Sequence, residues 1–281
     1  MKRNRPLECR LADGTKVFCR NREEARLVYR EVKGYVSRGI GLEKGAVVFD
    51  VGANIGLFTI WVGRLLEGDV KVYAFEPVPE TFELLRANAQ RSAPAQAKLF
   101  RFGLGRTSGA AAFSYYPNVP AVSRSYPGVT ESELRGLKSR FFAELGTLQR
   151  YTTAPRLLKW LGLLPPSLQS KVVDWTIRRA LQQEKVDCEI RTLSQVIADE
   201  AIQRIDLLKI DVEGAELDVL HGLEADDWPK IRQAVIEVHD IDGRVEAMSA
   251  MLRENGLNCV ELQQNTLMRV TGTLTLFARR D

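Results

Sequence analysis

From Ala46 to the end of the chain, short apolar runs alternate with segments whose apolar residues recur at helical spacing. The apolar runs predict strands at Val47–Asp50, Val70–Glu76, Lys98–Phe102, Ile205–Ile210, Ala234–Val238, Asn258–Glu261 and Leu274–Phe277. Short strands that alternate with helices are typical of a parallel sheet covered by helices on both faces. The pattern therefore predicts a doubly wound α/β domain of seven strands.

The last two predicted strands are joined by a polar link at Gln263–Asn265. A short link cannot cross over the sheet, so it predicts an antiparallel hairpin at the sheet edge. A final antiparallel strand differs from the all-parallel plan that binds dinucleotides. It is similar to the plan of Rossmann-like methyltransferases.

Two segments lie outside this alternation. Residues 1–45 predict a hairpin around Asp13-Gly14 and a helix from Arg22 to Arg38, which precede the main domain at 46–281. Residues 113–187 show helical stripes and no convincing core strand, and thus predict a mostly helical insertion. Between Arg135 and Lys185, ten Lys or Arg and three Asp or Glu give a net charge of +7, against +4 for the whole chain.

Composition excludes several classes of protein. The chain has 281 residues, 45% of them hydrophobic, and no apolar run of about 18 residues that would predict a membrane span. No apolar stretch follows the basic N-terminus, so we expect no signal peptide and a cytoplasmic protein. Four scattered cysteines without a CxxC pair and only two histidines argue against a disulfide scaffold or a zinc site.

The first strand runs into a glycine-bearing turn that carries Asp50, Gly52 and Gly56. Open α/β sheets bind ligands at this carboxyl end. The turn lacks the GxGxxG spacing of diphosphate sites, and Asp50 would repel a diphosphate. Glu76, twenty residues after Gly56, is placed to accept ribose hydroxyls. Together these residues predict a cationic, adenosine-bearing ligand such as S-adenosylmethionine (SAM).

Four ordered motifs, VVFDVGANIGLFT, VYAFEPVPETFELLRAN, IDLLKIDVEGAELDVLHGL and AVIEVH, resemble the FkbM family of SAM-dependent methyltransferases over residues 31–103 and 187–278. The resemblance implies a Rossmann-like methyltransferase sheet and O-methylation of natural products, lipids or sugars. It also implies the SAM-contacting residues, which are Asp50, Gly52, Ala53, Asn54 and Gly56 at the methionine end, Glu76 and Pro77 at the ribose, and Asp211.

Strand alternation places Lys209 and Asp211 on one face of the fourth strand, and Glu237 and His239 on one face of the fifth. We expect these four residues to form the catalytic group. Methyl transfer to a hydroxyl requires removal of its proton, and histidine titrates near neutral pH, so His239 is the predicted base. A structural ion pair of Lys209 and Asp211 remains an alternative, as does a divalent metal held by Asp211, Glu237 and His239.

The insertion is expected to cover the methyl-transfer site as a lid, with apolar residues such as Phe141, Phe142, Trp160 and Trp175 facing a pocket. Expected acceptors are hydroxyl-bearing small molecules, glycans or carrier-tethered molecules, and the basic insertion would suit an acidic carrier protein. A catalytically silent SAM-binding protein that holds an acidic partner is a second hypothesis. A nucleic-acid methyltransferase is disfavoured because no Asn-Pro-Pro-Tyr-like motif follows the fourth strand.

Overall fold

The computed structural model describes residues 5–92, 96–125, 128–143, 161, 163–239, 243–264 and 272–280. The main element is a seven-stranded sheet in the order β12-β13-β11-β10-β3-β4-β5. Its strands are β3 (Ala46–Val51), β4 (Val70–Phe75), β5 (Ala97–Phe100), β10 (Leu207–Ile210), β11 (Gln233–His239), β12 (Cys259–Gln263) and β13 (Thr273–Arg279). All seven predicted strands are present, and their ends lie within two residues of the prediction.

The direction of the strands confirms the predicted C-terminal hairpin. Neighbouring strands from β11 to β5 are parallel, whereas β13 runs antiparallel to both β11 and β12. The predicted link at Gln263–Asn265 is too short, because β12 ends at Gln263 and β13 begins only at Thr273. The sheet is the Rossmann-like sheet that the sequence predicts.

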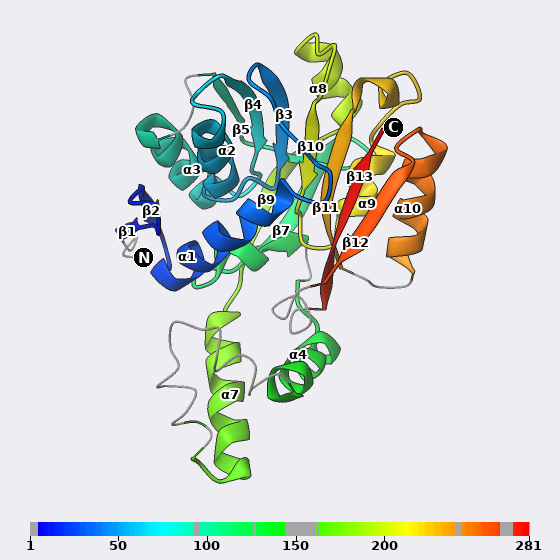
Figure 1. Cartoon of the computed structure of the whole chain (residues 1–281). Helices are drawn as coiled ribbons and strands as arrows, with labels where there is room; N and C mark the ends of the chain where they lie inside the picture. The colour runs from blue at the N-terminus through cyan, green and yellow to red at the C-terminus, as the bar shows by residue number, and fades with distance from the viewer. Residues whose placement is uncertain are drawn as a thin grey trace.

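Helices cover both faces of this sheet (Figure 1). One face packs against α2 (Leu57–Leu65) and α3 (Pro79–Ser92), and the other against α8 (Leu193–Asp199), α9 (Glu216–His221) and α10 (Arg244–Glu254). Val48 and Phe49 are neighbours in β3 and belong to the two opposite cores. The alternation of a strand thus supplies both cores, each of which excludes water from apolar side chains.

The N-terminal segment forms the predicted hairpin, β1 (Leu7–Arg10) with β2 (Lys16–Cys19). The predicted helix ends earlier than expected. It consists of α1 (Arg22–Glu31), capped by the side chain of Asn21, and then tightens into the 3₁₀ helix η1 (Val32–Tyr35). Tyr29 and Tyr35 are buried in the same core as α2. This segment therefore packs as part of the main domain.

The insertion begins and ends in β-strands, and the sequence analysis did not predict these strands. A second sheet has the order β6-β9-β7-β8, formed by β6 (Gly103–Leu104), β7 (Gly109–Tyr115), β8 (Arg124–Ser125) and β9 (Glu184–Arg191). The prediction missed β7 and β9 because the first half of β7 is Gly and Ala, and β9 is mostly charged, both of which disfavour a strand assignment. The short 3₁₀ helix η2 (Pro120–Val122) lies between β7 and β8.

Beyond this sheet, α4 (Glu131–Ala143) and α7 (Pro166–Ala180) have the predicted helical character, and they project from the end of the main sheet that α1 crosses (Figure 1). Trp175 on α7 is 62% exposed. Trp160 and the side chain of Phe141 lie outside the described residues. No helix in the described part of the chain is long and apolar enough to cross a membrane.

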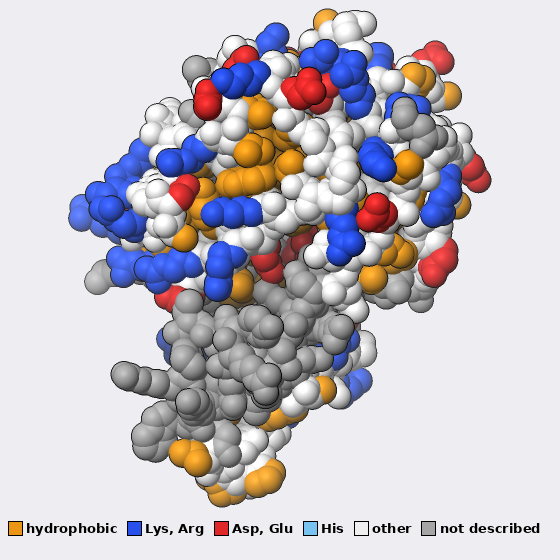
Figure 2. All heavy atoms as spheres, in the orientation of Figure 1, with side chains coloured by type: hydrophobic (Ala, Val, Ile, Leu, Met, Phe, Trp, Pro, Cys, Tyr) orange, Lys and Arg blue, Asp and Glu red, His pale blue; other side chains and the backbone are white. Residues whose placement is uncertain are grey.

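Figure 2 shows one face of the molecule, on which Lys and Arg side chains lie mainly over the sheet domain. Apolar side chains gather at the tip of the projection that contains α7. Leu163, Leu168, Val172 and Trp175 are the exposed large hydrophobic residues of this part of the chain. Apolar side chains also gather on the sheet domain, among the charged ones, so the visible face has two apolar areas.

Candidate active site

The turn between β3 and α2 passes very close to the end of β10. Gly52 has a left-handed φ of +74°, and a Cβ added there would lie 1.8 Å from the carbonyl oxygen of Asp211. Gly56 caps α2 at φ +85°, and a Cβ there would lie 2.6 Å from Leu85 Cδ1. Both positions thus require glycine, the first for contact with backbone and the second for helix packing.

Substituting Gly52 tests this contact. We expect Gly52→Ala to destabilise the fold more than Gly68→Ala does, because Gly68 shares the positive φ (+84°) but has no atom within 4 Å of an added Cβ. The backbone strain of about 1–3 kcal/mol is common to both variants, and overpacking adds about 1–3 kcal/mol only at Gly52. Urea unfolding measures the difference, and equal losses in the two variants would contradict the close approach.

Glu76, at the end of β4, forms hydrogen bonds to the turn between β3 and α2. Its carboxylate accepts the backbone N–H groups of Asn54 at 3.1 Å and Val78 at 2.9 Å. Burial raises the pKa of Glu76 to about 7, although these hydrogen bonds oppose the shift. A carboxylate has about four acceptor positions, so Glu76 retains capacity for two further hydrogen bonds.

A pocket lies where this turn meets the carboxyl ends of the strands. The predicted site residues that line it are Gly52, Ala53, Asn54, Glu76, Pro77, Lys209, Asp211 and Glu237. Three other predicted residues do not line it, namely Asp50, Gly56 and His239. The structure thus brings most of the predicted site together and places three residues behind it.

Asp50 faces the protein interior and not the pocket. It is fully buried, accepts the hydroxyl of Thr59 at 2.7 Å, and forms an ion pair with Lys209 Nζ at 3.1 Å. Lys209 also donates to the carbonyl of Gly52 at 2.8 Å and lies 3.6 Å from Asp211 Oδ2. The predicted pairing of Lys209 with Asp211 is present. Burial lowers the pKa of Lys209, but Asp50 and Asp211 outweigh it and raise the pKa overall.

Tyr35 joins the ends of β10 and β11. Its hydroxyl oxygen lies 3.2 Å from Asp211 Oδ2 and 3.0 Å from Glu237 Oε2. Burial raises the pKa of Asp211 and raises that of Glu237 well above its ordinary range. The sequence placed Tyr35 only within the predicted helix from Arg22 to Arg38, because nothing in the local pattern shows that its hydroxyl reaches residues about 200 positions away.

One face of α1 forms a wall of the pocket. Glu24, Val28 and Glu31 line it at spacings of four and three residues, which place them on one side of a helix. Burial raises the pKa of Glu24 and of Glu31 to about 7. Sequence reasoning missed this wall, although two acids at that spacing beside an apolar residue were a signal that could have found it.

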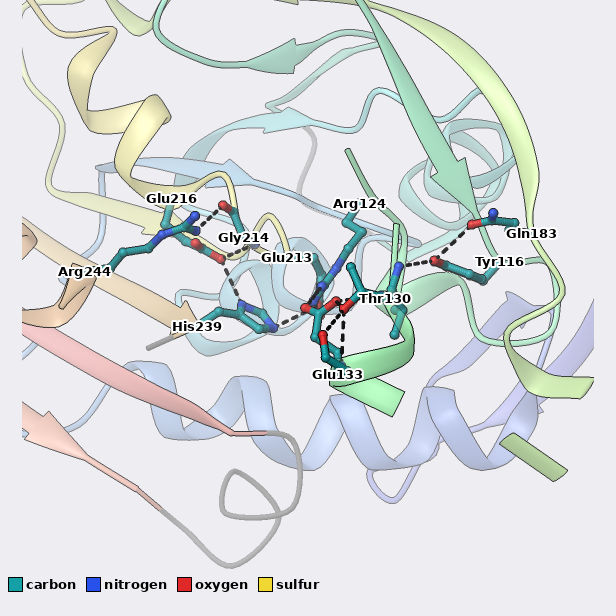
Figure 3. Close-up of polar contacts among 12 residues, drawn as sticks. Tyr116, Arg124, Thr130, Glu133, Gln183, Glu213, Gly214, Glu216, His239 and Arg244 are labelled. Atoms are coloured by element: carbon teal, nitrogen blue, oxygen red, sulfur yellow. Dashed lines mark hydrogen bonds and ion pairs between the residues drawn. The ribbon is translucent and has the colours of Figure 1, made fainter. Parts of the chain in front are cut away.

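His239 lies between two other carboxylates (Figure 3). Its Nε2 is 3.1 Å from Glu213 Oε2, and its Nδ1 is 3.2 Å from Glu216 Oε1. Burial lowers the pKa of His239, but the two carboxylates raise it to about 10. The imidazole is therefore protonated at neutral pH, and both of its nitrogens are engaged as donors.

The register of the sheet explains why His239 does not face Asp211 and Lys209 as predicted. Ile210 pairs with Ile236, so Asp211 and Glu237 directly follow paired residues on the two strands, while Glu213, in the turn after β10, contacts His239 two residues further along β11. The alternation of side chains along β11 correctly predicted the face of the sheet on which Glu237 and His239 lie. Which residues of β10 they meet depends on how the two strands are aligned, and no local sequence pattern determines that alignment. Among the described residues, no group of three His, Cys, Asp or Glu side chains is arranged to hold a metal ion.

Arg124 on β8 connects the insertion to this cluster (Figure 3). It forms ion pairs with Glu133 of α4 at 2.8 Å and with Glu213 at 3.5 Å. Burial raises the pKa of Glu213, but His239 and Arg124 outweigh it and lower the pKa overall. Glu213 therefore remains ionised in the pocket wall, held by one cation from the sheet and one from the insertion.

A ligand pocket at the carboxyl ends of a seven-stranded sheet with an antiparallel final strand defines a Rossmann-like methyltransferase. The chain belongs to the FkbM methyltransferase family, whose domain (Methyltransferase FkbM domain) matches residues 50–259. The protein is thus a methyltransferase, and its family implies SAM as the methyl donor.

Curated relatives share this domain. The chain is 36% identical to the 31-O-demethyl-FK506 methyltransferase FkbM of Streptomyces tacrolimicus, over 96% of each protein. It is 35% identical to the AMB antimetabolite synthetase AmbE of Pseudomonas aeruginosa, over 98% of this chain and 12% of that protein. It is 28% identical to the methyltransferase sdnD of Sordaria araneosa, over 88% of this chain and 87% of that protein.

Proposed function

We propose that this protein transfers the methyl group of SAM to a hydroxyl group of a small-molecule, sugar or lipid-type acceptor, with Asp211 as the general base. One observation carries the proposal. A single pocket is lined by Glu76 and the glycine turn and by the strand-end carboxylates Asp211 and Glu237. The pocket therefore combines acceptors for a ribose with a carboxylate that can take a proton.

The residues present fit SAM. Glu76 has two free acceptor positions for the ribose hydroxyls, and Gly52 leaves the space that a side chain would fill. Ala53, Asn54 and Pro77 complete this part of the lining. SAM supplies an electrophilic methyl group on a sulfonium when it is bound. The other residues of the pocket hold the acceptor and move its proton.

Asp211 is better placed than His239 to act as the base. Lys209 and Tyr35 face its Oδ2, whereas Oδ1 has no hydrogen-bond partner among the described residues. Asp211 Oδ1 would accept the hydroxyl proton of the acceptor, and a raised pKa makes this carboxylate a stronger base. Lys209 offsets the charge of Asp211 before the transfer, and Asp50 remains as the counter-ion of Lys209 once Asp211 is protonated. His239 holds Glu213 in the pocket wall.

The acceptor class follows from the carboxylates in the pocket, since carboxylates accept hydrogen bonds from hydroxyl groups. The names of two relatives, the 31-O-demethyl-FK506 methyltransferase and the hexuronic acid methyltransferase AglP of Haloferax volcanii, are consistent with oxygen-rich acceptors. We propose that the insertion selects the acceptor, free or tethered to an acidic carrier protein, because Phe113, Pro120 and Ser123 line the pocket. Mass spectrometry of candidate acceptors incubated with isotopically labelled SAM tests the reaction directly.

Replacing Glu76 tests the SAM site. We expect Glu76→Ala to weaken SAM binding by about 1–3 kcal/mol, the usual contribution of hydrogen bonds to a charged group. Binding should also tighten as the pH rises through about 7, because hydroxyl donors favour the ionised form of Glu76. Calorimetry measures both effects, with Glu83→Ala on the exposed side of α3 as the control. Unchanged affinity in Glu76→Ala would refute the ribose assignment.

A further inference from the structure

The position of Tyr35 limits which of the two neighbouring carboxyl groups, Asp211 and Glu237, can be protonated. Its hydroxyl oxygen is within hydrogen-bond distance of both Asp211 Oδ2 (3.2 Å) and Glu237 Oε2 (3.0 Å). A phenol has only one proton to donate. If Tyr35 donates to one carboxylate, the other contact is a hydrogen bond only when that carboxyl group carries a proton and donates it to the phenol oxygen.

The surrounding charges decide which carboxyl group carries the proton. Lys209 Nζ lies 3.6 Å from Asp211 Oδ2 and stabilises the ionised form of Asp211. Glu237 forms no ion pair among the described residues. The charged groups that act on Asp211 are the cations Lys209 and His239 and the carboxylates Glu213 and Glu216. The charged groups that act most strongly on Glu237 are all carboxylates, namely Asp211, Glu213 and Glu31. The cations therefore favour the ionised form of Asp211, and Glu237 is the protonated member.

We propose that Tyr35 is a positioning residue that makes Asp211 and Glu237 share one proton, with Glu237 donating to Tyr35 and Tyr35 donating to Asp211. The inference rests on the proposed function, since it assigns Asp211 as the single ionised carboxylate of the pair that faces the acceptor. In the reaction, the acceptor O–H bond breaks and its proton goes to Asp211 Oδ1, the new O–CH₃ bond forms, and the S–CH₃ bond of the sulfonium donor breaks with its electron pair left on sulfur. Glu237 keeps its own proton throughout this step.

Tyr35 is well held for this role. It is 4% exposed, it ends the 3₁₀ helix η1, and its ring makes an edge-on contact with Phe58 of α2 at 5.8 Å between centroids. It also precedes the family domain match at residues 50–259. The proton arrangement at the strand ends is therefore set by a residue outside the matched domain.

Tyr35→Phe tests the proposal because it removes the hydroxyl and keeps the ring. The readout is the carboxyl ¹³C NMR titration of Asp211 and Glu237 in the ligand-free protein, assigned with Asp211→Asn and Glu237→Gln. In the parent protein we expect one of the two groups to be protonated at pH 7. In Tyr35→Phe the lower of the two apparent pKa values should rise by about 1–2 units, the loss expected for a hydrogen bond to a charged group. The acid limb of the pH profile of kcat/KM should shift to higher pH together with this pKa.

Tyr29→Phe is the matched control, because Tyr29 is a buried tyrosine of the preceding helix α1 whose hydroxyl donates to Asp13 at 2.6 Å, away from the pocket. It should leave the titration of Asp211 and Glu237 unchanged. Two ionised carboxylates in the parent at pH 7, or identical titrations in Tyr35→Phe and the parent, would overturn the proposal. If no hydroxyl acceptor is methylated, the proposed function fails, and the NMR titration still decides the role of Tyr35 on its own.

Discussion

Asp211→Asn should lower kcat by about 10²- to 10⁴-fold, the usual contribution of a positioned general base. Asparagine keeps the size of the side chain and its hydrogen bond from Tyr35, but its amide cannot take a proton at neutral pH. SAM affinity should change by less than about tenfold, because the carboxylate of Glu76 and the backbone of the glycine turn remain intact. Single-turnover kinetics with labelled SAM and calorimetry measure the two quantities separately.

The control for this substitution is Asp218→Asn. Asp218 lies on α9, is 56% exposed and forms an ion pair with Arg106 at 3.3 Å, so the same chemical change occurs there without touching the pocket. A kcat that falls by less than about tenfold in Asp211→Asn would show that another group removes the proton. Glu213, the other ionised carboxylate in the pocket wall, would then be the next residue to substitute.

His239→Ala should destabilise the fold by about 3–5 kcal/mol at pH 7, since it removes the cation from two buried ion pairs and leaves Glu213 with Arg124 as its remaining cation. This effect has a distinct pH dependence. The pKa of His239 is raised from 6.5 to about 10, so its stabilising contribution is complete below pH 6.5 and is lost as the pH rises through 10. The difference between the parent and the variant should therefore shrink between pH 6.5 and 10.

Urea unfolding at several pH values in that window tests this prediction, with His221→Ala at the exposed end of α9 as the control. The result also separates two roles for His239. A general base with an ordinary pKa would give a variant of nearly parental stability whose turnover alone is lost. A pH-independent stability difference would mean that His239 is neutral in the folded protein.

The core of the fold could be predicted because its signals are local. Seven apolar runs gave the seven strands, and the glycine turn with Asp50 and Glu76 marked the ligand end of the sheet. Alternation along β10 correctly paired Lys209 with Asp211. These features depend on one strand or one turn at a time, and such patterns can be read from the sequence.

The remaining features depend on how distant segments align. The register between β10 and β11 places His239 beside Glu213 and not beside Asp211. The contacts of Tyr35 depend on where η1 docks, and the pairing of β7 with β9 joins segments about 75 residues apart along the chain. No local pattern encodes such alignments, so the position of Asp50 behind the pocket and that of His239 beside Glu213 could not be predicted from the sequence.

The wall that α1 contributes to the pocket bears on how such enzymes diverge. Glu24, Val28 and Glu31 face the pocket from a segment that precedes the matched family domain and holds none of its strand-end residues. Under the proposed function, substitutions on this helical face would reshape the acceptor part of the pocket and leave Glu76 and the glycine turn unchanged. Acceptor preference and methyl-donor binding would then be separable under selection, and libraries that vary this face of α1 would be a route to new acceptors.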